Sequence, residues 1–544
     1  MAGTLKHKST DVLIIGGGIS GLTAAYMLSQ QAVSITVLST GRGASPFVTG
    51  FDVPVEEQDS LDCFIKDTVQ SGRGQGNQQL VEALCSESYD ILPFLKELGF
   101  VFDMTGSHYQ ARQPVGASYP RVIGHGNTSG EIIQDLLVRR LEKTPLVEQC
   151  KNLRALRLLK ENGRIVGALC YDSSQKAFVA CQARATILAT GGFCRIYPFS
   201  TNTSDIGGEG IAMAYYADVP LTDLEFVQFE PSAAVWPKRI RGEGMITTLF
   251  FEGAVMRNAK GERFMLRYGP QAEKVNKDVL GMCIHRELQS GNATPHGGIW
   301  FDATGVGEKR LHEAYEYFVK RYDRVGINLA KEPVELAPAA HTSLGGVVIH
   351  PDCTTQTPGL LACGEAVGNI HGANRIGGMA GTETMVFGRK AGITALRLLN
   401  LAPQATDGAW TELLDEMTGS KNHADALSTE RMEAMRLKMQ QLLEKNLNLL
   451  RDGKDLAETA EQLGEMWDAI RKAGANETAE EQYSRIRLEN DMLTAYLLAL
   501  SALERADSVG CHQRKDAETA PGSRYRTEVT KANGKPVVCR RQLL

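Results

Sequence analysis

The residues best suited to chemistry in this sequence lie between Ala337 and Gly388. This stretch places His341 before a Gly-Gly turn and Arg375 at the end of the sequence His-Gly-Ala-Asn-Arg. Glycines are dense around both residues, so few side chains would keep a ligand away from the main chain. Such a segment can hold an anionic ligand and let a flat cofactor lie against backbone N–H groups. It predicts a binding platform, but the cofactor must be identified from another part of the chain.

A dinucleotide-binding motif near the N-terminus indicates the kind of cofactor. The apolar run Asp11–Ile15 is typical of a buried parallel strand, a G-x-G-x-x-G sequence follows at once, and Leu22–Leu28 has helical spacing. In this motif the first glycine allows the tight turn, the second lets a pyrophosphate approach, and the third lets helix and strand pack closely. The helix N-terminus supplies N–H groups and a partial positive charge. The predicted cofactor-binding residues of this segment are Gly16, Gly18, Ile19, Ser20 and Gly21.

Two further apolar strands favour a large FAD-binding domain over a compact NAD module. Ser34–Leu38 is expected to be the second strand, and Ser39 occupies the position after it, where an acid that binds a ribose hydroxyl is usual. Ala185–Gly192 is a later apolar strand that ends in a glycine turn containing Thr190 and Gly191, which together with Ser39 are further expected cofactor-binding residues. It could return to the same sheet after an insertion, which suits a split FAD-binding domain.

Composition narrows the class of protein. The chain has 544 residues, which predicts two or three domains, and a formal net charge of −5 without a long basic run, so nucleic-acid binding has no electrostatic support. The eleven cysteines are scattered without a C-x-x-C pair, so we expect neither a metal site nor an iron–sulfur cluster. We also expect no transmembrane segment and no signal peptide, and therefore a cytoplasmic protein.

The elements that must position these residues predict an α/β fold with an interrupted cofactor domain. A Rossmann-like FAD-binding domain is expected to be split by an α+β capping domain and followed by a helical C-terminal domain. The expected boundaries are 1–232 and 346–405 for the FAD-binding domain, 233–345 for the capping domain, 420–515 for the helical domain and 516–544 for an irregular tail.

Several longer motifs resemble the flavoprotein family of succinate dehydrogenase, fumarate reductase and L-aspartate oxidase. The similarity covers nearly the whole chain, and its most specific part is His371-Gly-Ala-Asn-Arg375. It also includes the sequence Ser-Asp-Ile-Gly-Gly-Glu-Gly-Ile-Ala-Met-Ala at 204–214, Gly261-Glu-Arg-Phe-Met265, Ala339-Ala-His341 and Cys363-Gly-Glu365. The resemblance implies an FAD-dependent oxidoreductase that transfers a hydride between flavin N5 and a carbon next to an activating group.

The resemblance also implies roles for particular residues. Arg375 matches an arginine that pairs with a substrate carboxylate, and His341 matches a histidine at the same end. An alternative for Arg375 is a salt bridge to a surface acid, and for His341 an ordinary core histidine. Glu209, Gly364, Glu365, Ala380 and Gly381 are expected to hold FAD. Gly43 stands near the position where the respiratory enzymes carry a flavin-linked histidine, so FAD should be bound non-covalently.

The capping-domain side of the expected site departs from the family pattern. Glu230 replaces the histidine of the family's Gln-Phe-His-Pro-Thr, and in an ungapped alignment Phe250 replaces the arginine of Thr-Glu-x-x-Arg-Gly-Glu-Gly. A gapped alignment would use Arg241 instead; the ungapped one keeps Gly261-Glu-Arg-Phe-Met in register. Lys277 takes the place of the proton-donating arginine. Lysine can donate a proton when desolvated, although it is also commonly a solvated surface residue.

These departures predict a substrate other than a C4 dicarboxylate. Arg375 and His341 retain one anion-binding end, whereas Glu230 and Phe250 face the other, where a second carboxylate would meet a buried acid. We therefore expect a monocarboxylate with a neutral, aromatic or amine-bearing far end. Alternatives are oxidation of an amino-acid or amine C–N bond, and an electron-transfer subunit whose site has decayed. An iron–sulfur or quinone-linked protein, at the inner face of a membrane, could serve as electron partner.

Overall fold

The N-terminal strand lies at the centre of a seven-stranded sheet in this computed structural model, which describes residues 5–399, 407–418, 426–474, 478–517 and 524–543. The strands in spatial order are β7 (Val147–Cys150), β2 (Ile35–Leu38), β1 (Lys6–Ile15), β10 (Ala177–Leu188), β9 (Arg164–Asp172) and β8 (Leu153–Glu161), with β17 (Leu360–Ala362) beside the end of β10. Val12, Leu13 and Ile14 are fully buried, as expected for a parallel strand covered on both faces. The parallel pairing of β1 with β2 and β10 confirms that the later strand returns to the same sheet.

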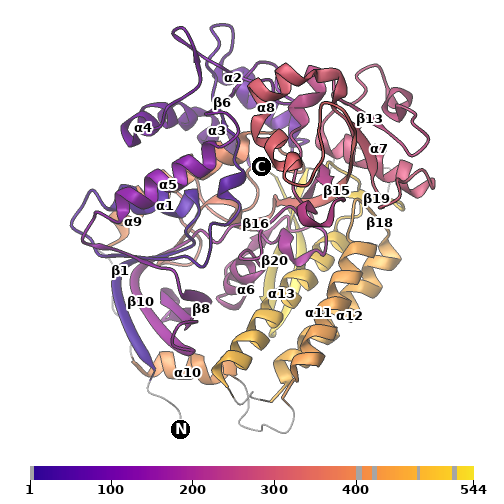
Figure 1. Ribbon diagram of the computed structural model, residues 1–544. Coiled ribbons are helices and arrows are strands. Elements are labelled where there is room, and N and C mark those ends of the chain that lie inside the picture. The colour runs from indigo at the N-terminus through magenta and orange to yellow at the C-terminus, as the bar shows by residue number, and fades with distance from the viewer. Residues whose placement is uncertain (1–4, 400–406, 419–425, 475–477, 518–523, 544) are drawn as a thin grey trace.

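Helices from distant parts of the sequence cover this sheet. The helix after the glycine motif, α1 (Ile19–Leu28), packs against α5 (Ser129–Leu141) and the long α9 (Met379–Leu398), and these helices lie together in Figure 1. The outer helices are α2 (Leu61–Ser71), α3 (Gln78–Glu87) and α4 (Ile91–Leu98). Ser60 and Asn77 cap the first two of these through side-chain oxygens that accept backbone N–H groups, which fixes where each helix begins.

The inserted capping domain has a sheet and a hydrophobic core of its own. Its strands in spatial order are β12 (Val227–Ala234), β15 (Val334–Ser343), β14 (Ile299–Asp302) and β13 (Val255–Arg257), with α7 (Lys277–Gln289) and α8 (Glu308–Asp323) beside them. Figure 1 shows this domain over one end of the cofactor domain. The expected start at residue 233 falls inside β12, and the expected end at 345 follows β15. Because β12 and β15 reach back toward the cofactor domain, they can carry site residues into the space between the domains.

The C-terminal part is mainly helical. Its helices α11 (Thr429–Asn446), α12 (Gly453–Lys472) and α13 (Ala479–Glu504) pack side by side (Figure 1), and α10 (Asp407–Thr418) lies against β8 and β9. Thr478 and Glu481 form a reciprocal capping box that fixes the start of α13. The expected boundaries at 405 and 420 lie outside the described residues. No helix in the described ranges is long and apolar enough to span a membrane.

The end of the chain is a β-hairpin, so the expectation of an irregular tail is wrong for residues 524–543. Strands β20 (Tyr525–Ala532) and β21 (Lys535–Gln542) are antiparallel, and β20 pairs with β11 (Leu221–Thr222), which in turn pairs with β16 (Gly346–Val347). Asn533 and Gly534 both have positive φ, as a two-residue type I′ hairpin turn requires. The hairpin therefore ties the end of the chain to the cofactor domain.

Candidate active site

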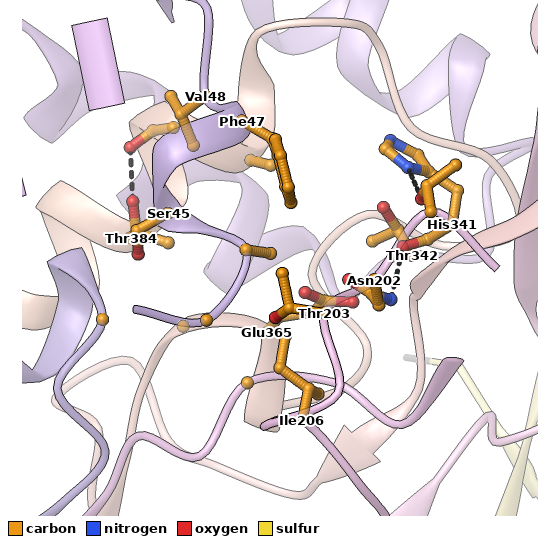
Figure 2. A pocket seen from close by; sticks show the side chains of 18 of the residues that line it. Ser45, Phe47, Val48, Asn202, Thr203, Ile206, His341, Thr342, Glu365 and Thr384 are labelled. Atoms are coloured by element: carbon orange, nitrogen blue, oxygen red, sulfur yellow. Dashed lines mark hydrogen bonds between the residues drawn. The ribbon is translucent and has the colours of Figure 1, made fainter. Parts of the chain in front are cut away.

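A cavity of about 520 Å³ runs from the glycine motif to the capping domain. Figure 2 shows Phe47 and Val48 on one side of it, His341 and Thr342 on the other, and Glu365 and Thr203 between them. It collects side chains from segments more than 300 residues apart in sequence. The predicted residues that line it are Gly16, Gly18, Ile19, Ser20, Ser39, Thr190, Gly191, Glu209, Glu230, Lys277, His341, Gly364, Glu365, Arg375, Ala380 and Gly381.

The glycine motif forms a close-packed turn at one end of the cavity. Gly16 has φ +125°, and a Cβ there would lie 2.0 Å from the carbonyl oxygen of Ala189. A Cβ on Gly21 would lie 2.1 Å from the carbonyl oxygen of Gly16, so Gly21 serves helix–strand packing and does not line the cavity wall. Gly18 is the N-cap of α1 and has no side chain to occupy the free N–H groups of the first turn. The N–H of Ile19 already donates to Ser45 Oγ at 2.9 Å, so an anion would bind the other N–H groups of this turn.

Unsatisfied buried hydroxyls show that this end is shaped for a polar ligand. The side-chain oxygens of Ser20, Thr190 and Thr203 are buried, line the cavity and have no hydrogen-bond partner in the described structure. Buried polar groups in native proteins are nearly always paired, so these three positions require a ligand with polar atoms along its length. The glycine turn, the open helix N-terminus and the hydroxyls together fit a dinucleotide.

Two acids at the cavity wall have opposite environments. Glu209 begins α6 (Glu209–Tyr216) and accepts hydrogen bonds from Arg154 at 2.7 Å and Arg487 at 3.2 Å; although burial opposes ionisation, the two arginines hold the pKa of Glu209 below its usual range. Burial raises the pKa of Glu365 to about 7, partly offset by the hydrogen bond from Ser343 N–H at 3.0 Å. Glu209 is therefore an anion, whereas Glu365 can also donate a proton in a hydrogen bond.

Arg375 is buried without an acidic partner. Its side chain donates only to the carbonyl oxygen of Ile376 at 3.1 Å and to Thr342 Oγ1 at 3.3 Å, and no acid among the described residues forms a salt bridge with it. Burial lowers the pKa of Arg375, an effect opposed by the fields of Glu365 and Glu383. The surface salt bridge considered as an alternative is therefore absent in the described part of the chain. A desolvated guanidinium with free donors, facing a cavity, is suited to bind a carboxylate.

Glu230 and Lys277 form an ion pair across the capping side of the cavity. Lys277, the first residue of α7, donates from Nζ to Glu230 Oε2 in β12, and Ser232 donates to Glu230 Oε1 at 2.7 Å. His341 Nε2 lies 3.9 Å from Glu230 Oε2. Burial would raise the pKa of Glu230, but the charge of Lys277 and the hydrogen bonds from Lys277 and Ser232 overcome this effect, and the pKa is lowered. The expected buried acid is thus present, but its charge is already compensated.

His341 is held as a neutral ring. Burial, reinforced by the charges of Lys277 and Arg375, lowers the pKa of His341 to about 3, with Glu230 opposing. Its Nδ1 is 2.7 Å from Thr201 Oγ1 (drawn in Figure 2), which fixes the ring orientation. A neutral imidazole can donate one hydrogen bond and accept another, so His341 can orient a ligand without adding a charge.

The structure corrects the prediction for Phe250. The 3₁₀ segment Thr247–Glu252 turns this side chain into the core of the capping domain, where it is 3% exposed and its ring centre is 5.5 Å from that of Phe301. Thr247 and Thr248 from the same segment line the cavity instead. Phe250 therefore supports the domain from inside and does not meet a ligand in this arrangement.

Two arginines that the preferred alignment did not place in the site line the cavity without an acidic partner in the described structure. Arg112 donates to Asn127 Oδ1 at 2.6 Å and to the carbonyl oxygen of Thr49 at 2.9 Å, without an acidic partner in the described structure. Arg241 lies at the cavity rim, with its guanidinium 4.2 Å from the Phe199 ring centre. The Arg241-Gly-Glu-Gly sequence was a usable signal for the second, whereas nothing in the spacing around Arg112 marks it.

The fold and the cavity define the class of protein as an FAD-dependent oxidoreductase with a capping domain. The sequence matches the family descriptions "FAD binding domain" over residues 11–380 and "Fumarate reductase flavoprotein C-term" over residues 436–535. The chain therefore belongs to the FAD-dependent flavoprotein family of the fumarate reductase and succinate dehydrogenase type. FAD is its cofactor.

Individual relatives agree with this assignment. The chain is 33% identical to one of the subunits of fumarate reductase (CoM/CoB) from Methanothermobacter marburgensis, covering 94% of this chain and 95% of that protein. It is 28% identical to L-aspartate oxidase from Yersinia pestis, covering 95% and 97%. Its fold matches a mutant of Escherichia coli quinol fumarate reductase FrdA with a TM-score of 0.91 at 24% identity, covering 99% and 97%.

The turn at Gly16 gives a direct test of cofactor binding. Replacing Gly16 with alanine would place Cβ against the Ala189 carbonyl group at a positive φ, and we expect FAD affinity to fall by about tenfold or more because overpacking costs about 1–3 kcal/mol. The measurement is the ratio of flavin to protein absorbance after purification and FAD titration. Gly244→Ala is the matched control, since its Cβ would make only an ordinary 3.9 Å contact. Equal FAD affinity in both variants would contradict the role of this turn.

Proposed function

We propose that this protein transfers a hydride between FAD and the carbon β to the carboxylate of a small molecule that is not a C4 dicarboxylate, while a proton is gained or lost at the carbon α to that carboxylate. Bound FAD supplies a hydride donor and acceptor at its ring nitrogen N5. The observation that carries the proposal is the asymmetry of the cavity: a buried arginine without an acidic partner lines it together with an ion pair whose charges already cancel.

Arg375 binds the substrate carboxylate through its planar fork. Because the guanidinium has no acid to displace, carboxylate binding does not require an existing salt bridge to break. His341, neutral and oriented by Thr201, donates or accepts a hydrogen bond beside it. The pairing also polarises the carboxylate, which stabilises negative charge that develops on the neighbouring carbon.

Lys277 holds the proton that the carbon α to the carboxylate gains or loses, while the hydride moves at the β carbon. Its Nζ carries donors beyond the one used by Glu230, and its side chain is 16% exposed at the cavity wall. In the reductive direction Lys277 Nζ donates a proton to the α carbon of the substrate, and the negative charge of Glu230 then favours the return of a proton to Nζ. In the oxidative direction Nζ accepts the proton from the same carbon. This assignment favours chemistry over the alternative of Lys277 as a solvated surface residue.

The capping side of the cavity disfavours a second carboxylate. Lys277 is the cation closest to Glu230, and the two charges compensate, so this end offers no net positive charge from that pair. A carboxylate placed beside this pair would lose part of its hydration and gain no net attraction from the pair, which leaves Arg241 at the rim as a cation that could meet it. A neutral or apolar far end of the substrate avoids this loss. A monocarboxylate therefore remains the expected substrate, but for a different reason. The capping side holds the neutralised Lys277–Glu230 pair, and not the unpaired Glu230 and the cavity-facing Phe250 that the sequence predicted.

Electrons must reach the flavin from another protein or small molecule. One relative is named as a subunit of a fumarate reductase. This name supports our proposal that the present chain also works with an electron-transfer partner, which would be iron–sulfur or quinone-linked. We propose that the protein acts in the cytoplasm and meets such a partner there or at the inner face of the membrane.

An anaerobic flavin-bleaching screen tests the proposed substrate class. The oxidised holoenzyme is mixed with saturated monocarboxylates, succinate and L-aspartate, and the photoreduced holoenzyme with their unsaturated counterparts, including fumarate. We expect a monocarboxylate to change the flavin spectrum faster than any C4 compound. Faster reaction with succinate or fumarate would refute the substrate class. Hydrogen peroxide production with an amino acid in air would favour amino-acid oxidation, and a flavin inert to every compound would favour an electron-transfer subunit.

A further inference from the structure

Asp52 is a buried acid that the proposed reaction does not use. It ends the short strand β3 (Phe51–Asp52), is 1% exposed, and neither of its carboxylate oxygens has a hydrogen-bond partner in the described structure. Its main chain, in contrast, is doubly anchored: its N–H donates to Thr382 Oγ1 at 2.8 Å, and its carbonyl oxygen accepts from the same hydroxyl at 3.0 Å. The backbone is fixed while the acid itself is unpaired, which is rare in native proteins.

This carboxyl group lies directly behind the wall of the FAD cavity. A Cβ built on Gly378 would lie 2.4 Å from Asp52 Oδ1, so the acid touches the backbone of that residue. Gly378 lines the cavity and is the N-cap of α9, whose residues Ala380 and Gly381 also line it. The Thr382 anchor belongs to the same helix. Asp52 is therefore separated from the cavity by one layer of backbone that contains no side chain.

The charges that face Asp52 come from three arginines. In decreasing strength they are Arg121, Arg375 and Arg112. Arg121 is already paired with Asp59 at 2.6 Å and Asp67 at 2.7 Å. Arg375 and Arg112 line the cavity, and neither has an acidic partner among the described residues. The remaining titratable neighbour is the buried thiol of Cys85 on α3, whose pKa is raised chiefly by burial.

The ionisation of Asp52 is finely balanced. Burial raises the pKa of this carboxyl to about 8, and the three arginines act against that rise. Anything that cancels the charge of Arg375 or Arg112 therefore removes support for the ionised form and shifts Asp52 toward the protonated form. Both arginines line the space that the cofactor and substrate occupy, so the charge in that space affects the ionisation of Asp52 alongside the constant contribution of Arg121.

We propose that Asp52 takes up a proton when the flavin is reduced. Two electrons and one proton entering the cofactor leave one net negative charge in the cavity, which offsets the guanidinium charges of Arg375 and Arg112. Near and above pH 8, where Asp52 is ionised in the oxidised protein, its carboxylate then accepts a second proton from solvent, so two electrons are accompanied by two protons instead of one. This inference depends on FAD binding and not on the identity of the substrate.

The dependence of the flavin midpoint potential on pH tests this coupling. The FAD-loaded full-length protein is titrated with dithionite and redox mediators between pH 6 and pH 10. Each proton taken up with the two electrons changes the potential by about 30 mV per pH unit. For the wild type we expect a slope of about 30 mV per pH unit at lower pH that steepens to about 60 mV per pH unit near and above pH 8. For Asp52→Asn we expect about 30 mV per pH unit throughout.

The direction of the slope change separates Asp52 from the flavin itself. A proton lost from the reduced cofactor makes the slope shallower as pH rises, whereas a group that is ionised only in the oxidised protein makes it steeper. Asp103→Asn is the matched control, because Asp103 also acts on Arg112 but is a partly exposed loop residue; it should shift the potential and keep the steepening. A straight line for the wild type, or the same steepening in Asp52→Asn, would overturn the proposal.

A second measurement covers the case in which Asp52→Asn does not fold. Proton uptake by the wild-type protein is followed with an indicator dye during photoreduction, first at pH 7 and then near pH 9. We expect about one proton per flavin at the lower pH and a value approaching two at the higher pH. A difference infrared spectrum of the reduction should then contain the band of a newly protonated carboxylic acid. One proton at both pH values would refute the coupling.

Discussion

Replacing Arg375 with methionine should lower kcat/KM for the carboxylate substrate by about 10³-fold, equivalent to about 4 kcal/mol, since truncating one partner of a buried charge pair costs about 2–5 kcal/mol. The guanidinium makes no salt bridge in the described structure, so its charge is uncompensated until an anion binds. Methionine fills a similar volume without a donor. Steady-state kinetics with the best compound from the bleaching screen gives the measurement.

Stability should move in the opposite direction from activity in this variant. A buried unpaired charge destabilises the fold, so Arg375→Met should keep the melting temperature of the FAD-loaded protein or raise it. This result would show that lost activity does not arise from unfolding. Arg375→Lys keeps the charge but loses the planar fork, and we expect an intermediate rate.

Arg241→Met serves as the matched control for charge. Arg241 is an exposed arginine at the rim of the same cavity, and its guanidinium rests on Phe199. We expect its replacement to change kcat/KM by less than about tenfold, because exposed charges contribute about 0–1 kcal/mol. If Arg375→Met kept its activity within the same range, Arg375 would not be the carboxylate anchor.

The glycine turn of the cofactor domain was predictable because its glycine positions are dictated locally. Gly16 has a positive φ, and a Cβ built on Gly21 would lie 2.1 Å from a carbonyl oxygen, so both positions require glycine. Both glycines are visible in the sequence directly after a buried strand. The C-terminal hairpin had a comparable signal that the sequence prediction did not use: Asn533-Gly534 is a favoured type I′ turn. Rules about short sequence motifs are therefore enough to predict the glycine turn and the C-terminal hairpin.

The substrate half was harder to predict because it depends on contacts between distant residues. Glu230 and Lys277 are separated by 47 positions, and only the packing of α7 against β12 makes them an ion pair. The prediction for Phe250 was wrong for a related reason. An alignment gives its position in the chain, but the turn of the 3₁₀ segment decides that Phe250 points into the domain core while Thr247 faces the cavity.

Replacing Lys277 with methionine should lower kcat by about 10²–10⁴-fold, the usual effect of removing a general acid or base. KM should change little, because Arg375 continues to hold the carboxylate. The change also leaves Glu230 buried without its main cation, so the pKa of Glu230 should rise and the carboxyl should become protonated at ordinary pH. Pre-steady-state flavin reduction or oxidation as a function of pH measures both effects.

The double variant Lys277→Met with Glu230→Gln separates proton transfer from charge balance. Glutamine keeps the hydrogen bond with Ser232 and removes the unpaired acid, so stability lost in the single variant should return. If Lys277 is the proton donor, kcat stays low in the double variant despite the restored melting temperature. If kcat also recovers, Lys277 serves only to neutralise Glu230, and the proton comes from another group. The two outcomes differ by the full 10²–10⁴-fold expected for general acid–base catalysis, about 3–5 kcal/mol, so a modest loss of folded protein could not be mistaken for either.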